Sequence, residues 1–258
     1  MFYNFAVLKR NLQMKIIGKI LYFFYQWLIY LPVLLVLTIL TAITTIIFAP
    51  VFGDKEITYI PARAWSRLAC ALAFIKVEIK GAENFDRNTS YIFLANHQSI
   101  FDIFVVYGWL KSRFKWIMKI ELRKIPFVGA ACEAAGHIFI DRSNPIAAKK
   151  SIDIAKKKII DGSSIVVFPE GTRTYDGAVG SFKRGAFKIA TDFDLPLVPI
   201  TISGAFERMH RKTFLITPGK IIMTIHPVIP HSHYETDEEQ KAIIAKVRKT
   251  IINELQNL

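Results

Sequence analysis

An uncharged stretch of 34 residues, from Ile20 to Gly53, limits what this chain can fold into more than any other feature. A helix in a soluble core rarely runs so long without a polar face, whereas about 20 consecutive apolar residues suffice to cross a bilayer. The alternative is a helix buried beneath the rest of the protein. The stretch is too long for a cleaved signal peptide and has no A-x-A-like end. We therefore expect residues 1–60 to form a membrane-associated helical segment.

Pro32 and the charges at the two ends predict how this segment is arranged. A proline inside a helix removes a hydrogen bond and kinks or breaks the helix, so Pro32 divides the stretch into two pieces that are each short for a span. Basic residues flank both ends, and basic flanks favour the cytoplasmic side. We expect a helix–break–helix hairpin that dips into one leaflet from the cytoplasmic face. A single tilted span is the alternative.

Residues 61–258 alternate between short apolar runs and helical patterns. Runs rich in Val, Ile and Phe are typical of buried strands, and they occur at 76–80, 91–95, 137–140, 164–168, 197–202 and 221–225. One helix should begin after Asn144 as cap and end just before Gly162, and a Thr236-x-x-Glu239 capping box should begin the last helix. This order predicts a layered α/β domain with a mostly parallel sheet flanked by helices. Such sheets bind ligands at the carboxyl ends of their strands.

The chain has 34 Lys and Arg against 21 Asp and Glu, a formal net charge of +13. A basic surface favours a polyanionic partner: an anionic lipid, a phosphorylated substrate or nucleic acid. Residues 108–129 interleave basic with aromatic side chains, which suits an anionic membrane surface and also single-stranded nucleic acid. Because the chain has an apolar membrane segment, we expect an anionic bilayer as its partner and no nucleic acid.

A histidine and an aspartate follow the expected strand at 91–95. Two residues five apart on one helix point about 140° apart, so His97 and Asp102 meet only if His97 lies in the turn before the helix. Asn96 or Ser99 would then cap that helix. A carboxylate in this position holds the imidazole in one tautomer and leaves the other nitrogen free as a base. Taken alone, the motif is explained equally well by a buried structural histidine.

Two further polar clusters follow apolar strands. The first is Pro-Glu170-Gly-Thr-Arg, in which Gly171 permits a sharp turn whose amides can face an anion, and Arg173 offers a planar fork that suits phosphate. The second is Asp141-Arg142. Alone, each cluster is also explained by an ordinary turn at a strand end with an ion pair.

Four blocks stand in one order along the chain: Asn96-His97-x-x-x-x-Asp102, 136–142, Phe168-Pro-Glu-Gly-Thr-Arg173 and Val198-Pro-Ile. Together they closely resemble the glycerolipid acyltransferase family, in particular the 1-acyl-sn-glycerol-3-phosphate acyltransferases, over about residues 60–230. The resemblance implies an α/β acyltransferase domain, here 61–258, whose site opens toward the membrane beside an N-terminal helical motif.

The same resemblance implies a role for each matching residue. His97 is the general base and Asp102 is the residue that orients it. Arg173 is a phosphate ligand. The residues that bind the acyl acceptor are Lys119, Arg142, Glu170, Gly171, Thr172 and Arg173.

The implied reaction moves a fatty acyl group from acyl-CoA or acyl carrier protein to the sn-2 hydroxyl of lysophosphatidic acid, giving phosphatidic acid. The thioester is already activated, so we expect no cofactor, no metal and no acyl-enzyme. His226, His231 and His233 lack accompanying carboxylates or cysteines, and we expect no metal there. Another lysolipid or glycerol 3-phosphate as acceptor is the alternative.

Other functional classes have less support in the sequence. A serine hydrolase needs a G-x-S-x-G elbow, and the chain contains none, with Ser99 the only candidate nucleophile. Neither G-x-x-x-x-G-K-[ST] nor G-x-G-x-x-G occurs, which disfavours nucleotide-binding enzymes. A non-enzymatic module that binds anionic membranes would explain the charge, but not three polar clusters at strand ends.

Overall fold

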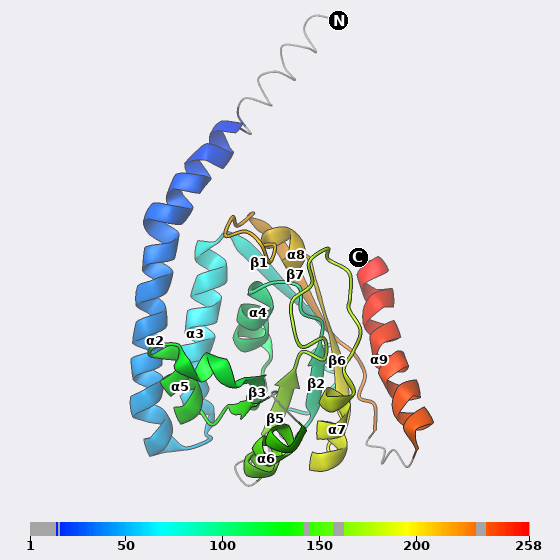
Figure 1. Cartoon of the computed structure of the whole chain (residues 1–258). Helices are drawn as coiled ribbons and strands as arrows, with labels where there is room; N and C mark the ends of the chain where they lie inside the picture. Colours follow the sequence, from blue (N-terminus) through cyan, green and yellow to red (C-terminus); the bar gives the residue numbers. More distant parts are fainter. Residues whose placement is uncertain (1–13, 15, 142–144, 157–162, 231–235, 258) are drawn as a thin grey trace, which may run out of the picture.

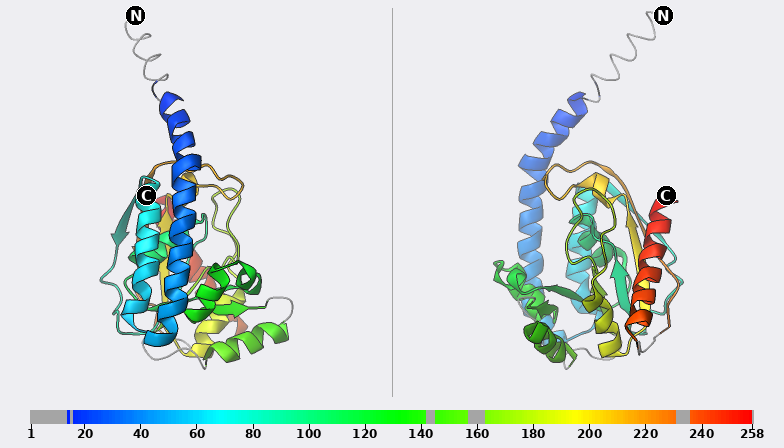
Figure 2. Two further views of the ribbon diagram at one scale, coloured as in Figure 1. Left: turned by 90° about the vertical axis from the view of Figure 1, so that its left-hand side faces the viewer. Right: turned by 45° about the vertical axis from the view of Figure 1, so that its right-hand side comes forward.

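The computed structural model describes residues 14, 16–141, 145–156, 163–230 and 236–257 (Figure 1). These residues form an α/β body with a long apolar helix along one side (Figure 1). The amino-terminal end of that helix extends beyond the body in each view (Figure 2).

The centre of the body is a seven-stranded sheet among the described residues. Its strands are β1 (Ile75–Lys80), β2 (Ile92–Ala95), β3 (Phe114–Lys119), β4 (Ile138–Ile140), β5 (Ser164–Val167), β6 (Leu197–Ser203) and β7 (Gly219–Ile225). The order across the sheet is β1-β7-β6-β2-β5-β3-β4. Every neighbouring pair is parallel except β6 and β7, so the predicted mostly parallel α/β fold is confirmed.

Helices cover both faces of this sheet because its strands are apolar on both sides. In β2, Phe93 and Ala95 point into one core cluster and Ile92 and Leu94 into the other. Helices α3 and α4 pack on the first face and α6, α7 and α9 on the second (Figures 1 and 2). The helical elements are η1 (Gln26–Tyr30), α2 (Leu31–Phe52), α3 (Glu56–Leu72), α4 (Phe101–Trp109), η2 (Ile120–Lys124), α5 (Val128–Ala134), α6 (Pro145–Lys156), α7 (Arg184–Phe193), α8 (Ala205–Arg208) and α9 (Asp237–Gln256).

The predicted break at Pro32 is wrong, because one helix of 37 residues runs from Ile16 to Phe52. The turn Gln26–Tyr30 is π-helical, and the N–H of Leu31 bonds to the carbonyl of Gln26, five residues back. Pro32 lies in the first turn after this widened stretch, where a missing N–H is tolerated. The helix is long and apolar enough to cross a membrane. Whether it crosses the bilayer or dips into one leaflet stays a prediction.

The chain reverses instead after Phe52, at Gly53, and α3 then runs beside α2 (Figure 1). The indole N–H of Trp65 on α3 donates to the Thr38 hydroxyl on α2 at 2.9 Å. The buried Gln26 side chain donates to the carbonyl of Phe214 and accepts the N–H of Ile216. Polar contacts therefore fasten the apolar helix to the body, while many of its apolar side chains face outward.

All six predicted strands are present, and β3 is the one that the sequence did not indicate. Residues 114–117, expected at a membrane surface, are buried in β3. Lys115 can lie there because its ammonium donates to the Asp54 carboxylate at 2.6 Å, and a paired charge is the kind that proteins bury.

Predictions about helix ends have mixed outcomes. The Thr236–Glu239 capping box is confirmed, with both hydrogen bonds present. For α6, the expected cap Asn144 and end Gly162 lie outside the described residues. The predicted division between residues 60 and 61 stays a prediction, and α3 runs across it.

Candidate active site

Three polar clusters and Lys119 stand at the carboxyl ends of four adjacent strands. Strands β2, β5, β3 and β4 are parallel neighbours in that order, so their carboxyl ends meet along one edge of the sheet. His97 follows β2, Glu170 follows β5, Lys119 ends β3 and Asp141 follows β4. Strands lie about 4.8 Å apart, which places Lys119 about 10 Å along the edge from His97.

His97 and Asp102 form a hydrogen-bonded pair at the start of α4. The His97 Nδ1 atom lies 2.9 Å from Asp102 Oδ2, with His97 in the turn and Asp102 in the first helical turn, as predicted. Asp102 is fully buried, and its Oδ2 also accepts the backbone N–H groups of Gln98 at 2.6 Å and Ser99 at 2.8 Å. This bonding fixes the proton on His97 Nδ1.

The second nitrogen of His97 is available to a ligand. Nε2 makes no hydrogen bond with any residue that the structure describes, and 14% of the His97 side chain is exposed. The ring lies flat against Phe168, with centroids 3.9 Å apart and planes 9° apart. Trp116 stacks on Phe168 in turn, at 5.3 Å. The stack holds the imidazole plane, so that Nε2 is presented edge-on as an acceptor of a proton.

The expected cap Asn96 is wrong, and α4 begins after Ile100, which has no capping side chain. The Ser99 hydroxyl oxygen accepts the N–H of Phe101, the first residue of α4, at 3.4 Å. Asn96 instead bridges to β6: it donates to the carbonyl of Ile202 at 2.8 Å and accepts that residue's N–H at 2.7 Å. The buried Ser99 hydroxyl donates to the carbonyl of Met209. Asp102 already accepts the N–H groups that precede the helix, which removes the need for another cap.

Glu170 braces the turn that carries His97. Its Oε1 accepts the backbone N–H of His97 and its Oε2 that of Gly180, each at 2.8 Å. Burial raises the pKa of the Glu170 carboxyl, and these two hydrogen bonds oppose the shift. Sequence reasoning assigned Glu170 to the acyl acceptor, whereas its observed contacts are to the protein backbone.

The rest of this loop turns beside His97. Gly171 has φ +73°, a conformation that favours glycine, and this confirms the predicted sharp turn. Thr172 is exposed, and the N–H of Thr174 donates to the carbonyl of His97 at 3.1 Å. The Arg173 guanidinium makes no hydrogen bond or ion pair with any described residue, so it is available to an anion.

Two more expected site residues are basic. Lys119 is exposed at the end of β3, and its register partner on β4 is Ile140. Arg142 lies outside the described residues.

Three histidines come into question as metal ligands, and no metal is expected there. His226 Nε2 lies 2.8 Å from the Thr201 hydroxyl, while His231 and His233 are not among the described residues. Within the described part of the chain, no three His, Cys, Asp or Glu side chains gather where they could hold a metal ion.

Sequence reasoning missed the aromatic stack on His97. Phe168 stands in a recognised block, but nothing in its spacing predicts a ring contact. The stack depends on the pairing of β3 with β5, which sets Trp116 opposite Val166, and β3 was not predicted. The only available signal was the aromatic residue at the end of a strand beside a motif.

The chain is similar in sequence to known acyltransferases. An acyltransferase family model matches residues 76–203. The 1-acyl-sn-glycerol-3-phosphate acyltransferase alpha of Bos taurus is 33% identical over 179 residues, covering 69% of this chain and 62% of that protein. A 1-acyl-sn-glycerol-3-phosphate acyltransferase of Chlamydomonas reinhardtii is 30% identical over 226 residues, covering 85% and 65%. The chain thus spans slightly less than two thirds of the length of these relatives.

The fold is also that of a solved acyltransferase structure. The crystal structure of the 1-acyl-sn-glycerophosphate (LPA) acyltransferase PlsC from Thermotoga maritima aligns with a TM-score of 0.71. It is 24% identical, and the alignment covers 95% of this chain and 97% of that one. The likeness therefore includes the N-terminal helices as well as the sheet.

Proposed function

This chain belongs to the 1-acyl-sn-glycerol-3-phosphate acyltransferase family, and we propose that it transfers a fatty acyl group from an acyl thioester to the sn-2 hydroxyl of 1-acyl-sn-glycerol 3-phosphate. The product is phosphatidic acid. The observation that supports this proposal is the His97–Asp102 pair at the carboxyl edge of the sheet, whose Nδ1–Oδ2 hydrogen bond leaves Nε2 without a partner among the described residues. The acyl donor is acyl-CoA or acyl carrier protein.

His97 acts as the base in this reaction. Its Nε2 takes the proton of the acceptor hydroxyl as that oxygen attacks the thioester carbonyl carbon. The tetrahedral intermediate then breaks its carbon–sulfur bond, and the leaving thiolate takes up the proton from His97. General-base assistance of this kind contributes typically about 10²–10⁴-fold. Asp102 holds the imidazole and balances its transient positive charge. The acyl group passes directly to the acceptor, without a covalent enzyme intermediate.

Basic side chains along the same edge hold the acceptor phosphate. Arg173 lies on the loop that packs against His97 and has its guanidinium available. Lys119 ends β3, the strand next to β5, and in the sequence Arg142 comes two residues after Ile140, where β4 ends. We propose that these cations bind the phosphate, with Gly171 and Thr172 shaping the turn around it. A guanidinium suits this task because it offers two donors to phosphate oxygens.

We also propose that the chain is attached to the cytoplasmic face of a membrane. The support is the apolar helix Ile16–Phe52 with its exposed side chains and the basic residues at both of its ends. Residues 1–60 would form the attachment, and residues 61–258 the catalytic domain. The proposed acceptor and product are lipids, so a site beside the bilayer shortens the path of both molecules between the membrane and the site.

An acceptor panel tests the proposed function. The detergent-purified chain is given an acyl thioester, carried by coenzyme A or by acyl carrier protein, with lysophosphatidic acid, glycerol 3-phosphate or lysophosphatidylcholine. We expect phosphatidic acid from lysophosphatidic acid and little product from the other two. Transfer to another acceptor alone would keep the chemistry and refute the proposed substrate. No transfer to any acceptor from either carrier, by folded protein, would favour a membrane-binding module.

A further inference from the structure

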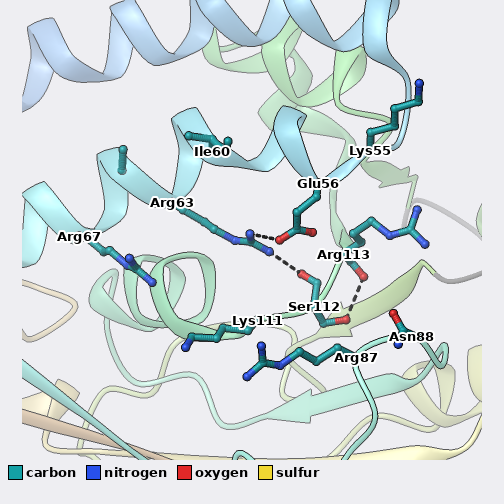
Figure 3. Close-up of a pocket in the computed structure, with 11 residues that line it drawn as sticks. Lys55, Glu56, Ile60, Arg63, Arg67, Arg87, Asn88, Lys111, Ser112 and Arg113 are labelled. Carbon is teal, nitrogen blue, oxygen red and sulfur yellow. Dashed lines mark hydrogen bonds and ion pairs between the residues drawn. The ribbon is translucent and has the colours of Figure 1, made fainter.

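A basic groove lies apart from the His97 site, between α3 and two loops of the body (Figure 3). Its volume is about 740 Å³, within the range of small-ligand sites. One wall is α3, and the other is formed by residues 87–88 and 111–113. Six basic side chains line it, namely Lys55, Arg63, Arg67, Arg87, Lys111 and Arg113.

The groove is at the opposite edge of the sheet from the proposed catalytic base. Residues 87–88 precede β2 and residues 111–113 precede β3, so both loops lie toward the amino ends of these strands. His97 follows the carboxyl end of β2. Four residues of strand span about 13 Å, and this length separates the groove from the acyl acceptor site.

The protein itself positions two of the arginines on α3. The Arg63 guanidinium pairs with Glu56, the single carboxylate among the residues that line the groove. Arg67 Nε donates to the carbonyl of Gly108 at 2.8 Å. These bonds fix the α3 wall and point both guanidinium groups toward the groove (Figure 3).

Three other cations have no partner in the part of the chain that the structure describes. Lys55, Arg87 and Lys111 are exposed, and their side chains make no hydrogen bond or ion pair with a described residue. Six positive charges against one negative charge leave a net charge of +5 on the lining. Charges of one sign in a concave site raise the local concentration of the opposite ion, so the groove suits a phosphate-bearing ligand.

The outer face of α3 indicates which phosphate-bearing ligand fits. Ile57, Ile60 and Leu68 are 50%, 55% and 45% exposed, and at 100° per residue they share an arc of about 80°. Arg63 and Arg67 fall on one side of this arc, toward the groove. An apolar stripe bordered by cations is typical of a helix at a membrane interface. A soluble nucleotide has no acyl chains that would cover the stripe, whereas a phospholipid has.

We propose that the groove binds the phosphate headgroup of an anionic phospholipid, with the acyl chains of that lipid lying along the apolar stripe of α3. The groove begins at Lys55, directly after the apolar helix ends at Phe52. Basic clusters next to a membrane helix bind anionic headgroups. The inference rests on the membrane attachment proposed above, but it does not require acyl transfer.

The test titrates the detergent-purified full chain with phosphatidylglycerol or phosphatidylcholine and measures bound lipid by native mass spectrometry. A triple variant, Lys55→Gln, Arg87→Gln and Lys111→Gln, removes the three unpartnered charges and leaves the α3 arginines in place. Each charge near a lipid headgroup contributes about fivefold in affinity. We therefore expect the triple variant to bind phosphatidylglycerol about 100-fold more weakly than the parent chain does.

The matched control removes three charges from the other side of the body. Its substitutions to Gln are at three exposed lysines of α7 and α9: Lys188, Lys246 and Lys249. We expect this control to bind phosphatidylglycerol within twofold of the parent, and phosphatidylcholine to bind each protein weakly. Thermal unfolding in detergent confirms that all three proteins are folded.

Three outcomes would overturn the proposal. Equal phosphatidylglycerol binding by the parent and the triple variant would show that the groove is not the lipid site. Displacement of the lipid by coenzyme A, with the same dependence on the three cations, would assign the groove to the phosphates of the acyl donor. If the triple variant lost binding to acyl carrier protein while its lipid binding stayed unchanged, the groove would be assigned to an acidic protein. Vesicle flotation of the triple variant tests membrane attachment separately.

Discussion

Replacement of Asp102 by asparagine removes the charge behind His97 while keeping the side chain nearly the same size. In the protein, Asp102 Oδ2 accepts three N–H groups: His97 Nδ1 and the backbone amides of Gln98 and Ser99. An asparagine oxygen can still accept both backbone amides. What it loses is the charge-assisted hydrogen bond to His97, worth about 1.5–3 kcal/mol. If that bond acts on the transition state, kcat falls about 10- to 150-fold.

The second carboxylate oxygen sets the expected effect on stability. Asp102 Oδ1 is buried and has no hydrogen-bond partner among the described residues. In Asp102→Asn the amide NH₂ takes this position and stays unsatisfied, at a cost of about 1–3 kcal/mol. For a chain of this size we expect Tm to fall by about 2–10 °C, which leaves the variant folded at 25 °C.

The assay measures phosphatidic acid formation by the two proteins over a range of lysophosphatidic acid concentrations. Asp102 is fully buried and therefore out of reach of a bound substrate, so KM should stay within about threefold while kcat falls. Asp153→Asn, an exposed position on α6, is the control and should change neither. A folded Asp102→Asn variant with kcat within twofold of the parent would refute the assignment of Asp102 as the residue that orients the base.

Two further substitutions test the surroundings of the site. Glu170→Gln places an amide NH₂ against the backbone N–H of His97 or Gly180. It should lower Tm by about 2–10 °C and reduce kcat, while Glu207→Gln at an exposed position should change neither. Unchanged Tm and kcat in Glu170→Gln would contradict this expectation. Burial lowers the pKa of His137 to about 3 in the folded protein, whereas in the unfolded chain the pKa is 6.5. Below pH 6.5 the unfolded chain therefore binds a proton that the folded protein does not, and the folded protein loses stability until the pH reaches about 3. From pH 7 to pH 5 the free energy of unfolding falls by about 2 kcal/mol from this cause. His137→Gln should remove that part of the pH dependence, as measured by denaturant unfolding at several pH values. An equal change of unfolding free energy with pH in the two proteins would contradict this expectation.

The sequence predicts the parts of the fold that depend on local pattern. Runs of Val, Ile and Phe mark six strands because a sheet covered on both faces needs apolar side chains on both. The geometry of His97 and Asp102 follows from helix periodicity alone, since only a histidine in the turn can reach the aspartate. Both predictions are confirmed because each depends on a few residues close together in the chain.

Strand β3 shows where local pattern fails. Lys115 is charged and stands among aromatic residues, so the segment resembles a surface. It is buried because Asp54, 61 residues earlier, accepts its hydrogen bond at 2.6 Å. The hydrogen bonds that Asp54 accepts from Lys115, Ser163 and Tyr59 keep the pKa of its carboxyl low despite burial. No pattern within β3 contains this information.

The helix at Pro32 shows a different limit. Proline predicts a break because its ring clashes with the preceding turn and it has no N–H to donate. The π turn at 26–30 comes directly before the proline, and such a turn widens the helix where the ring would otherwise crowd it. Gln26 lies at the start of that turn and is buried against residues 214 and 216. The π turn therefore occurs together with contacts to residues nearly 190 positions later in the chain, which no local pattern contains.

The most direct test of the proposed mechanism compares the parent chain with His97→Ala in one measurement. Both proteins are mixed with lysophosphatidic acid and an acyl thioester that carries a radiolabel in its acyl group, and labelled phosphatidic acid is counted over time. We predict product from the parent and a rate at least about 100-fold lower from His97→Ala, with no label covalently held by either protein. Equal rates from the two folded proteins, or a labelled acyl-enzyme in the parent, would contradict direct transfer assisted by His97.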